Sequence, residues 1–426
     1  MQRSLDAMRH ARPLRDGARA AVSSDPAGTA TVASAAVAGL ALLVLFLDTD
    51  LSGAGLATGI AAWAVVALAV TVLVARPAVV PRAWGAVVAR VLGVPAAAVD
   101  VARLVEGPSL LGLLGVVSCA ACAWLLAWGC VALVRAARRW RKLLAIPVGF
   151  VIAQFVLLPF TMAAFGTHPP RLAFTAATPV GAERVTFPAS DGIPLAAWYT
   201  PSRNGAAVVL LPGAGGTKAD TASHAAVLVR NGYGVLAIDP RGGVESGGHG
   251  MLWGWHGERD VAGAVTYLAG RADVDPARIG ALGLSMGGEE AITAAAADPR
   301  IATVVAEGAS VRVPGDRVWG EVGVSGAIQA AYYPIMWGLA DLMTDPAPPI
   351  TLAEAARRLG SRQVLLIESN DENDAAAGPV IRDAAPTAVE LWAMPDTGHT
   401  QGLFTHPQEW ETRVIGFLDA HLGVTR

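Results

Sequence analysis

The hydrophobicity and the charge balance of the sequence both change at Pro169-Pro170, and this change limits the folds that the chain can adopt. Long apolar runs dominate residues 1–170, which carry 14 Lys+Arg against 7 Asp+Glu, whereas residues 171–426 carry 18 against 28. We therefore expect two units of opposite charge and unequal hydrophobicity, in different surroundings. The acidic second unit lacks the basic surface that phosphate backbones need, so nucleic acid is not an expected partner.

Four apolar runs in the first unit are long enough to cross a bilayer, which takes roughly 20 residues. They lie at about 30–47, 51–75, 109–134 and 143–165. The prediction is a basic N-terminal tail over 1–28, followed by an all-α transmembrane region over 29–168. The segment 82–106 mixes charged and apolar residues and is predicted to lie at the membrane interface as an amphipathic helix. A fifth span in this segment is the alternative.

The number of spans decides on which side of the membrane the second unit lies. Five arginines within the first 19 residues place the N-terminus in the cytoplasm by the positive-inside rule. Four spans then put the second unit in the cytoplasm but the basic stretch Arg135–Lys142 outside, against the rule. Five spans put that stretch inside and the second unit outside. We expect a multi-pass protein of the cell membrane, with both topologies open.

The second unit, 169–426, alternates continuous apolar stretches with segments of helical spacing. Four of the apolar stretches read as buried strands that end in loops, namely AAVVLLPGAGG, GYGVLAIDPRGG, RIGALGLS and RQVLLIES. Unbroken apolar strands separated by helices are typical of a parallel sheet covered on both faces. The expected fold class is therefore α/β.

Ser285 lies in the stretch GLSMGG, between a strand candidate and a helix candidate. Gly283 and Gly287 complete the pattern G-x-S-x-G, in which a sharp turn strains the serine backbone and glycine leaves room for it. A serine hydroxyl becomes a nucleophile when a base takes its proton. His399, on the loop after the last strand candidate, is the expected base.

The imidazole needs a carboxylate to fix its tautomer and stabilise its charged form. The loop NDEND that follows RQVLLIES offers Asp371, Glu372 and Asp374. Glu372 is favoured because it lies five residues past Ile367, the usual place for the acid after such a strand. Asp371 is the alternative, since aspartate is the commoner residue type in this role.

A developing oxyanion needs preorganised N–H donors. The backbone N–H of Met286, directly after the serine, is expected to supply one. The loop PGAGG is expected to supply the second from Ala214, with Gly213 as the alternative.

Five motifs carry a family resemblance: VTFPASDGIPLAAWYTP, VVLLPGAGG, YGVLAIDPRGGVESGG, DVDPARIGALGLSMGGEEAITAAAADPRI and MPDTGHT. Together they resemble the α/β-hydrolase superfamily over about residues 180–423, and more narrowly the membrane-anchored bacterial serine hydrolases of the Bem46-like kind. The resemblance implies an eight-stranded, mostly parallel sheet, a Ser–acid–His triad, and hydrolysis without a cofactor or metal. Pro212 and Val244 depart from the usual family residues near the pocket mouth.

Residues of about 310–360 are too long for a simple connection between two strand candidates. In the resembling fold, such an insertion usually forms a lid. Its aromatic residues Trp319, Tyr332 and Trp337 are candidates for the lining of an apolar acyl pocket. A helical cap packed on its own core is the alternative.

The expected function is a membrane-embedded serine hydrolase that cleaves an ester-type bond, in a carboxylester or a lipid-like substrate, through an acyl-enzyme on Ser285. Peptidase or thioesterase activity on the same triad is one alternative. A non-enzymatic membrane scaffold with a vestigial hydrolase domain is another. The expected partners are a small-molecule or lipid-like acyl substrate and the membrane.

Overall fold

The computed structural model describes residues 128–137, 145–169, 176–319 and 323–425, together with the isolated positions 113, 116, 117, 120 and 143. The first two expected spans and the amphipathic segment lie outside these residues, as does most of the third span. The arrangement of four transmembrane helices therefore stays a prediction.

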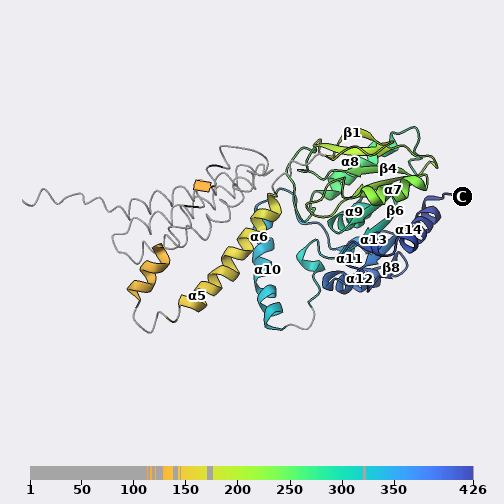
Figure 1. Ribbon diagram of the computed structural model, residues 1–426. Helices are drawn as coiled ribbons and strands as arrows, with labels where there is room; N and C mark the ends of the chain where they lie inside the picture. The colour runs from red at the N-terminus through yellow and green to blue at the C-terminus, as the bar shows by residue number, and fades with distance from the viewer. Residues whose placement is uncertain are drawn as a thin grey trace, which may run out of the picture.

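An eight-stranded sheet forms the centre of the second unit (Figure 1), with the strand order β1-β2-β4-β3-β5-β6-β7-β8. The strands are β1 (Glu183–Pro188), β2 (Pro194–Thr200), β3 (Ala207–Leu211), β4 (Gly234–Ile238), β5 (Ile279–Leu284), β6 (Ile301–Glu307), β7 (Gln363–Glu368) and β8 (Val389–Ala393). β2 pairs antiparallel with β1 and β4, and the other neighbours are parallel. β3, β4 and β5 are buried throughout. This sheet confirms the predicted α/β class.

Helices cover both faces of the sheet (Figure 1), as two separate hydrophobic clusters show. One face carries α7 (Ala222–Arg230), α13 (Gly402–Thr405) and α14 (Pro407–Leu422). The other carries α8 (Gly257–Ala269), α9 (Met286–Ala297), α11 (Leu352–Arg357) and α12 (Glu372–Ala384). The carboxyl ends of the parallel strands meet at one edge of this sandwich, which is where open α/β sheets bind ligands.

The helix that precedes the sheet runs through α5 (Ala145–Ile152), the π-helical stretch η3 (Ala153–Leu157) and α6 (Leu158–Thr167). Pro159 has no N–H to donate, and its ring crowds the carbonyl four residues back. The wider π-helical turn directly before it is one of the irregularities at which helices adjust to such a residue. The proline therefore reshapes this helix without ending it.

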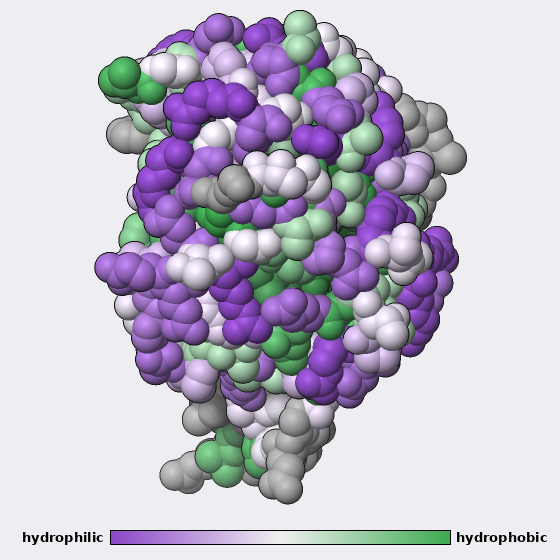
Figure 2. All heavy atoms as spheres, turned by 90° about the vertical axis from the view of Figure 1, so that its right-hand side faces the viewer, coloured by the Kyte–Doolittle hydropathy of each residue, from purple (hydrophilic) through white to green (hydrophobic). Residues whose placement is uncertain are grey.

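Within the described part of the chain, Pro147–Thr167 is the one helix long and apolar enough to cross a membrane, by length and composition. It overlaps the fourth expected span. Its outer part exposes Val148, Phe150 and Val151, whereas most of α6 is buried against the second unit. The face of the second unit that points away from this helix carries mostly hydrophilic side chains (Figure 2).

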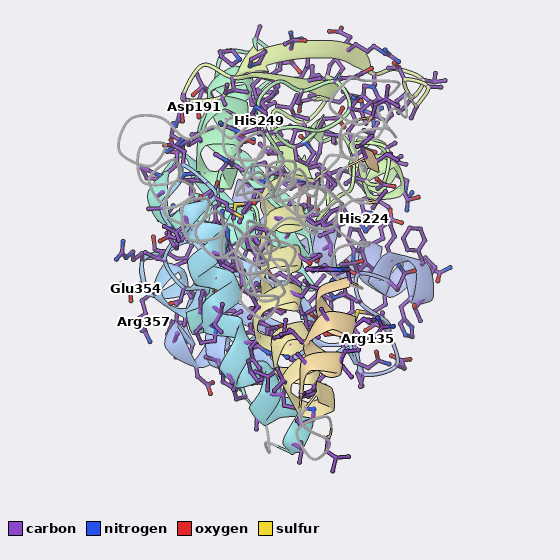
Figure 3. The ribbon with its side chains drawn as sticks, turned by 90° about the vertical axis from the view of Figure 1, so that its left-hand side faces the viewer. Arg135, Asp191, His224, His249, Glu354 and Arg357 are labelled. Carbon is purple, nitrogen blue, oxygen red and sulfur yellow. The ribbon has the colours of Figure 1, made fainter. Side chains whose placement is uncertain are left out.

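The insertion between β6 and β7 places another long helix beside α6. It contains η4 (Pro314–Asp316), α10 (Val324–Leu342) and α11. α10 lies beside α6 in both views (Figure 1 and Figure 3), and the two helices share a hydrophobic cluster. α6 also packs closely against the loop that carries Trp253, because a Cβ on Gly166 would lie 2.2 Å from the Trp253 ring. The expected lid and the apolar helix are thus packed together.

Trp410 of α14 is a fully buried side chain that anchors the C-terminal helix to the sheet. Its indole Nε1 donates to Oε2 of Glu307 at 2.8 Å, and the backbone N–H of Gly402 donates to Oε1 at 2.8 Å. Burial raises the pKa of Glu307, and these two donors act in the opposite direction. The C-terminal end of β6 therefore fixes both α14 and the loop that leads to it.

We predict that Trp410→Ala lowers the free energy of unfolding by about 3–5 kcal/mol, because it leaves a large cavity and an unpaired acceptor. Thermal unfolding of purified protein should show a fall in Tm on the order of 10 °C. The control is Phe404→Ala, whose ring is 56% exposed. Equal losses in the two variants would contradict the anchoring role of Trp410.

Candidate active site

Ser285 lies on a sharp turn between β5 and α9, with φ 52° and ψ −122°. A Cβ on Gly283 would lie 2.0 Å from the carbonyl oxygen of Gly287, and a Cβ on Gly287 would lie 2.6 Å from that of Leu211. Both contacts are with backbone, so only glycine fits on either side of the serine. The backbone N–H of Ser285 donates to the carbonyl of Glu307 at 2.7 Å and holds the turn on β6.

The side chain of Ser285 meets His399, which lies on the loop after β8. The distance from Ser285 Oγ to His399 Nε2 is 2.9 Å, and His399 Nδ1 lies 2.8 Å from Oδ2 of Asp374. Gly308 permits this approach, because its φ is +73° and a Cβ there would lie 2.8 Å from His399 Cε1. The structure thus brings together the serine and the histidine that the sequence pattern singled out.

The carboxylate that holds His399 is Asp374, which corrects the expectation of Glu372 or Asp371. Helix α12 begins at Glu372, so this side chain is exposed, while Asp371 caps the helix by accepting from the N–H of Asn373 at 2.8 Å. Asp374 lies at the third helical position and is 1% exposed. Its Oδ2 also accepts from Ser369 Oγ at 2.6 Å. Helix capping therefore moves the acid further along the chain than the loop pattern indicates.

The hydrogen bond from Asp374 raises the pKa of His399, and burial opposes it. The negative charge of Asp374 favours the imidazolium that forms when the base takes the serine proton. With Nδ1 held by the carboxylate, Nε2 is the nitrogen that faces Ser285 Oγ. This arrangement can generate a serine nucleophile by general-base catalysis.

The two expected oxyanion donors, Met286 and Ala214, both line the cavity next to Ser285. Within the described residues, neither backbone N–H donates to a protein acceptor. Gly213 packs against the nucleophile, because a Cβ there would lie 3.3 Å from Ser285 Cβ. The turn at the start of α9 and the loop after β3 therefore place two N–H groups without a protein acceptor among residues that line the cavity at Ser285, where an oxyanion hole requires donors.

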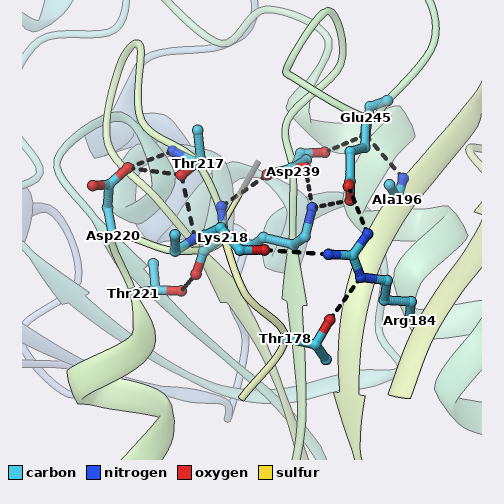
Figure 4. Close-up of polar contacts among 12 residues, drawn as sticks. Thr178, Arg184, Ala196, Thr217, Lys218, Asp220, Thr221, Asp239 and Glu245 are labelled. Carbon is cyan, nitrogen blue, oxygen red and sulfur yellow. Dashed lines mark hydrogen bonds and ion pairs between the residues drawn. The ribbon is translucent and has the colours of Figure 1, made fainter. Parts of the chain in front are cut away.

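An ion-pair network centred on the buried side chains of Lys218 and Asp239 holds the loop after β3 (Figure 4). Lys218 is 5% exposed, and its Nζ contacts the carboxylates of Asp239 and Glu245, the second at 2.6 Å. Its backbone N–H donates to Oδ1 of Asp239 at 2.9 Å, and Arg184 joins from β1 at 3.2 Å from Glu245. Breaking a buried pair leaves an uncompensated charge. The network thus fixes the loop that carries Ala214.

A cavity of about 330 Å³ opens at Ser285. Met162 of α6 and Met336 of α10 contribute apolar wall on the side of the two long helices, and Arg317 and Asn373 contribute polar groups. Glu289 also lines it and is buried; its Oε1 accepts from the N–H groups of Ser310 at 3.1 Å and Val311 at 2.9 Å. This carboxylate positions the start of the insertion over the site.

Only one of the three aromatic residues expected to line a pocket, Trp337, lies in the wall of this cavity. Tyr333 lines it in place of Tyr332, because it shares a helix face with Met336 and Trp337 at three and four positions. Tyr332 is turned by about 100° around the helix axis from Tyr333. The two rings pack against each other, with 5.2 Å between their centroids. Trp319 meets Tyr333 edge-on at 5.5 Å. Tyr332 and Trp319 thus contact the wall residue Tyr333 without lining the cavity themselves.

Among the described residues, one group has the spacing of a metal site: the ligand atoms of Asp371, Asp374 and His399 lie within 4.8 Å of one another. Asp374 and His399 bond to each other and His399 to Ser285, while Asp371 caps α12. Hydrogen bonds therefore account for every member of this group.

Glu307, Glu289 and Gly308 were not anticipated as supports of the site. Glu307 is the last residue of a mostly apolar strand candidate, and Gly308 follows it directly. A charged residue at a strand end, followed by glycine, was the sequence signal that could have indicated a role for both residues at the site. Glu289 stands four residues after the nucleophile on the buried face of α9. Nothing in its local pattern indicates the loop that it binds.

The sheet order, the strained serine turn after β5, and the triad in the chain order Ser285, Asp374, His399 define this chain as an α/β hydrolase with a serine nucleophile. The profile of the X-Pro dipeptidyl-peptidase (S15) family matches residues 189–393. This match covers all eight strands except β1.

Comparison with curated proteins finds partial relatives. The uncharacterised protein YfhR of Salmonella typhi is 32% identical over 127 residues, which are 28% of this chain and 41% of that protein. The uncharacterised protein Rv2307c of Mycobacterium tuberculosis is 33% identical over 143 residues, 31% of this chain and 50% of that protein. The chain thus matches half or less of the length of these relatives.

Similar solved structures include the esterase Pf2001 of Pyrococcus furiosus, with 22% identity and a TM-score of 0.48, covering 60% of this chain and 97% of that one. The α/β hydrolase GrgF of a Penicillium species is 20% identical with a TM-score of 0.45, covering 57% and 99%.

We predict that Asp374→Asn lowers kcat by roughly three to four orders of magnitude, because the amide favours the wrong imidazole tautomer. The acid limb of the pH profile should also move. In the wild type, kcat/KM falls on acidification through a His399 pKa above the ordinary value of about 6.5, since the base must be neutral. Without the Asp374 charge that limb moves to lower pH.

Glu372→Gln is the matched control, because Glu372 neighbours the acid in sequence but is exposed. Its pH profile should overlay that of the wild type. A large loss of kcat in Glu372→Gln, with Asp374→Asn unaffected, would contradict the structural assignment of the acid.

Proposed function

We propose that this protein is a membrane-embedded serine hydrolase that cleaves an ester-type bond of a lipid-like acyl substrate. The observation that carries the proposal is the hydrogen-bonded chain Ser285–His399–Asp374, which opens onto a cavity beside free N–H donors. His399 Nε2 takes the hydroxyl proton as Ser285 Oγ bonds to the carbonyl carbon. The N–H groups of Met286 and Ala214 receive the negative oxygen.

Collapse of this intermediate expels the alcohol, which takes the proton from His399, and leaves an acyl group on Ser285. A water molecule then gives a proton to His399 and attacks the acyl carbon. The Oγ–acyl bond breaks as His399 returns that proton to Ser285 Oγ, and the acid product leaves. No cofactor enters these steps. The protein supplies positioning, a base and N–H donors.

An apolar substrate is supported by a second cavity of about 230 Å³ behind the oxyanion donors. It shares Leu252 and Met286 with the catalytic cavity, and Phe165 of α6 and Met251 also line it. Apolar walls of this kind favour hydrocarbon groups over polar ones. The helix that contributes Phe165 is the one that, among the described residues, is long and apolar enough to span a membrane.

A fluorophosphonate probe tests the nucleophile in membranes that contain the full chain. Wild type and Ser361→Ala should label, because Ser361 is exposed and lies before β7, away from the catalytic cavity. Ser285→Ala should not label, and His399→Ala should label at least 100-fold more slowly, since general-base catalysis contributes about 10²–10⁴-fold. Undiminished labelling of Ser285→Ala would sink the assignment, and an unlabelled wild type would favour a non-enzymatic scaffold.

A peptidase is the second candidate, favoured by the S15 family profile over residues 189–393. The same triad cleaves amides, so substrates decide between the two activities. We expect p-nitrophenyl esters to be turned over and an X-Pro p-nitroanilide to be cleaved far more slowly. The opposite order of kcat/KM would support the peptidase.

Membrane embedding is tested by extraction of membranes at alkaline pH with carbonate. We expect the chain to stay in the pellet, because a stretch such as Pro147–Thr167 partitions into lipid. Release into the supernatant would count against embedding. Protease treatment of intact cells then separates the alternatives, since four spans protect the hydrolase domain and five spans expose it.

A further inference from the structure

Arg317 lines the catalytic cavity with Ser285 and His399 but takes no part in the triad. It follows η4 in the insertion, and its guanidinium lies over the rings of Trp319 and Tyr333, 5.3 and 5.4 Å from their centroids. Nη1 donates to Oδ1 of Asn373, and Nη2 donates to Oε1 of Gln329 at 3.5 Å. Two aromatic faces and two amides thus hold the guanidinium in one orientation at the cavity wall.

The charge of Arg317 has no counter-ion within the described part of the chain. No carboxylate there lies within ion-pair distance of its guanidinium, and its buried Nε–H has no acceptor. Arg317 is half-buried, and the two arginines that are buried in the described part of the chain differ from it: Arg241 pairs with Asp191 and Asp260, and Arg312 pairs with Glu258. An amide oxygen orients a guanidinium without neutralising it, so no group among the described residues neutralises the charge of Arg317 at the cavity wall.

Two carboxylates share the cavity, and hydrogen bonds to backbone tie both. Glu289 holds the N–H groups of Ser310 and Val311 through Oε1, and Asp371 caps α12 through Oδ1. Neither is bonded to Arg317. A cationic substrate is therefore the alternative to an anionic one, because the remaining carboxylate oxygens of Glu289 and Asp371 would bind a cation.

We propose that Arg317 binds an anionic group, a carboxylate or a phosphate, on the substrate that Ser285 attacks. A guanidinium presents its donors in a planar fork that matches oxyanions, and charge-assisted hydrogen bonds of this kind strengthen where water is excluded. The substrate class is then an acyl compound with an acidic group near the scissile carbonyl and an apolar part for the second cavity. This inference rests on the proposed hydrolase function.

Two esters of equal chain length test the inference by turnover. The purified full chain is assayed in neutral detergent with p-nitrophenyl pentanoate and with the mono-p-nitrophenyl ester of glutaric acid. We expect kcat/KM to be at least about tenfold higher for the glutarate ester, which corresponds to about 1.4 kcal/mol. The ratio should fall to about 1 or below in Arg317→Gln, and Arg317→Lys should restore part of it because the charge returns.

Arg413→Gln is the control, because the Arg413 guanidinium also lies over a ring, that of Trp392 at 4.7 Å, but outside the cavity. Its ratio should equal that of the wild type. A loss of both esters by the same factor in Arg317→Gln would show a structural role and overturn the inference. So would a wild type that hydrolyses both esters equally well.

Calorimetric binding of hexanoate, hexyl phosphate and hexylammonium gives a measurement that needs no turnover. We expect the anions to bind more tightly than the ammonium, and Arg317→Gln to remove the difference; the better anion identifies carboxylate or phosphate as the source. Tighter binding of hexylammonium would overturn the inference in favour of Glu289 and Asp371. Anion selectivity in a protein without probe labelling or turnover would uphold the site and reject only the hydrolase proposal.

Discussion

The buried carboxylate of Glu307 joins parts of the active site that are far apart in the sequence. The backbone carbonyl oxygen of Glu307 accepts from the backbone N–H of Ser285. The two carboxylate oxygens accept from the backbone N–H of Gly402 and the indole N–H of Trp410. One residue at the end of β6 therefore holds the nucleophile turn, the loop that follows His399, and α14. Burying a charge is costly unless it is hydrogen-bonded, so the burial of this carboxylate depends on the Gly402 and Trp410 donors.

The long apolar helix belongs to the active site as much as to the first unit of the chain. α6 contributes Met162 to the catalytic cavity and Phe165 to the apolar cavity beside it, and it packs on α10. Under the proposed function, an acyl substrate would approach Ser285 between elements whose outer surfaces are apolar. The membrane attachment and the choice of substrate would then have one physical origin, the hydrophobic surface of the two helices.

Much of the site could be predicted because it depends on short-range geometry. The turn at Ser285 requires glycine at positions 283 and 287, since any Cβ there would meet backbone atoms, and this requirement is written directly in the sequence. His399 follows from its place after the last strand. The acid did not follow, because the start of α12 depends on the Asp371 cap and moves the buried side to Asp374.

The alternation of buried strands and helices, and hence the sheet, could be predicted from the sequence alone, as could the positions of Ser285 and His399 and the loop that carries Ala214. These are set by local periodicity and by steric exclusion within a few residues. Three features depend on the packing of distant segments: which carboxylate reaches His399, that Tyr333 rather than Tyr332 lines the cavity, and that Arg317 lines it with no counter-ion among the described residues. The physical reason is that each of these depends on which face of a helix meets a distant segment, and packing between elements, not local pattern, settles that contact.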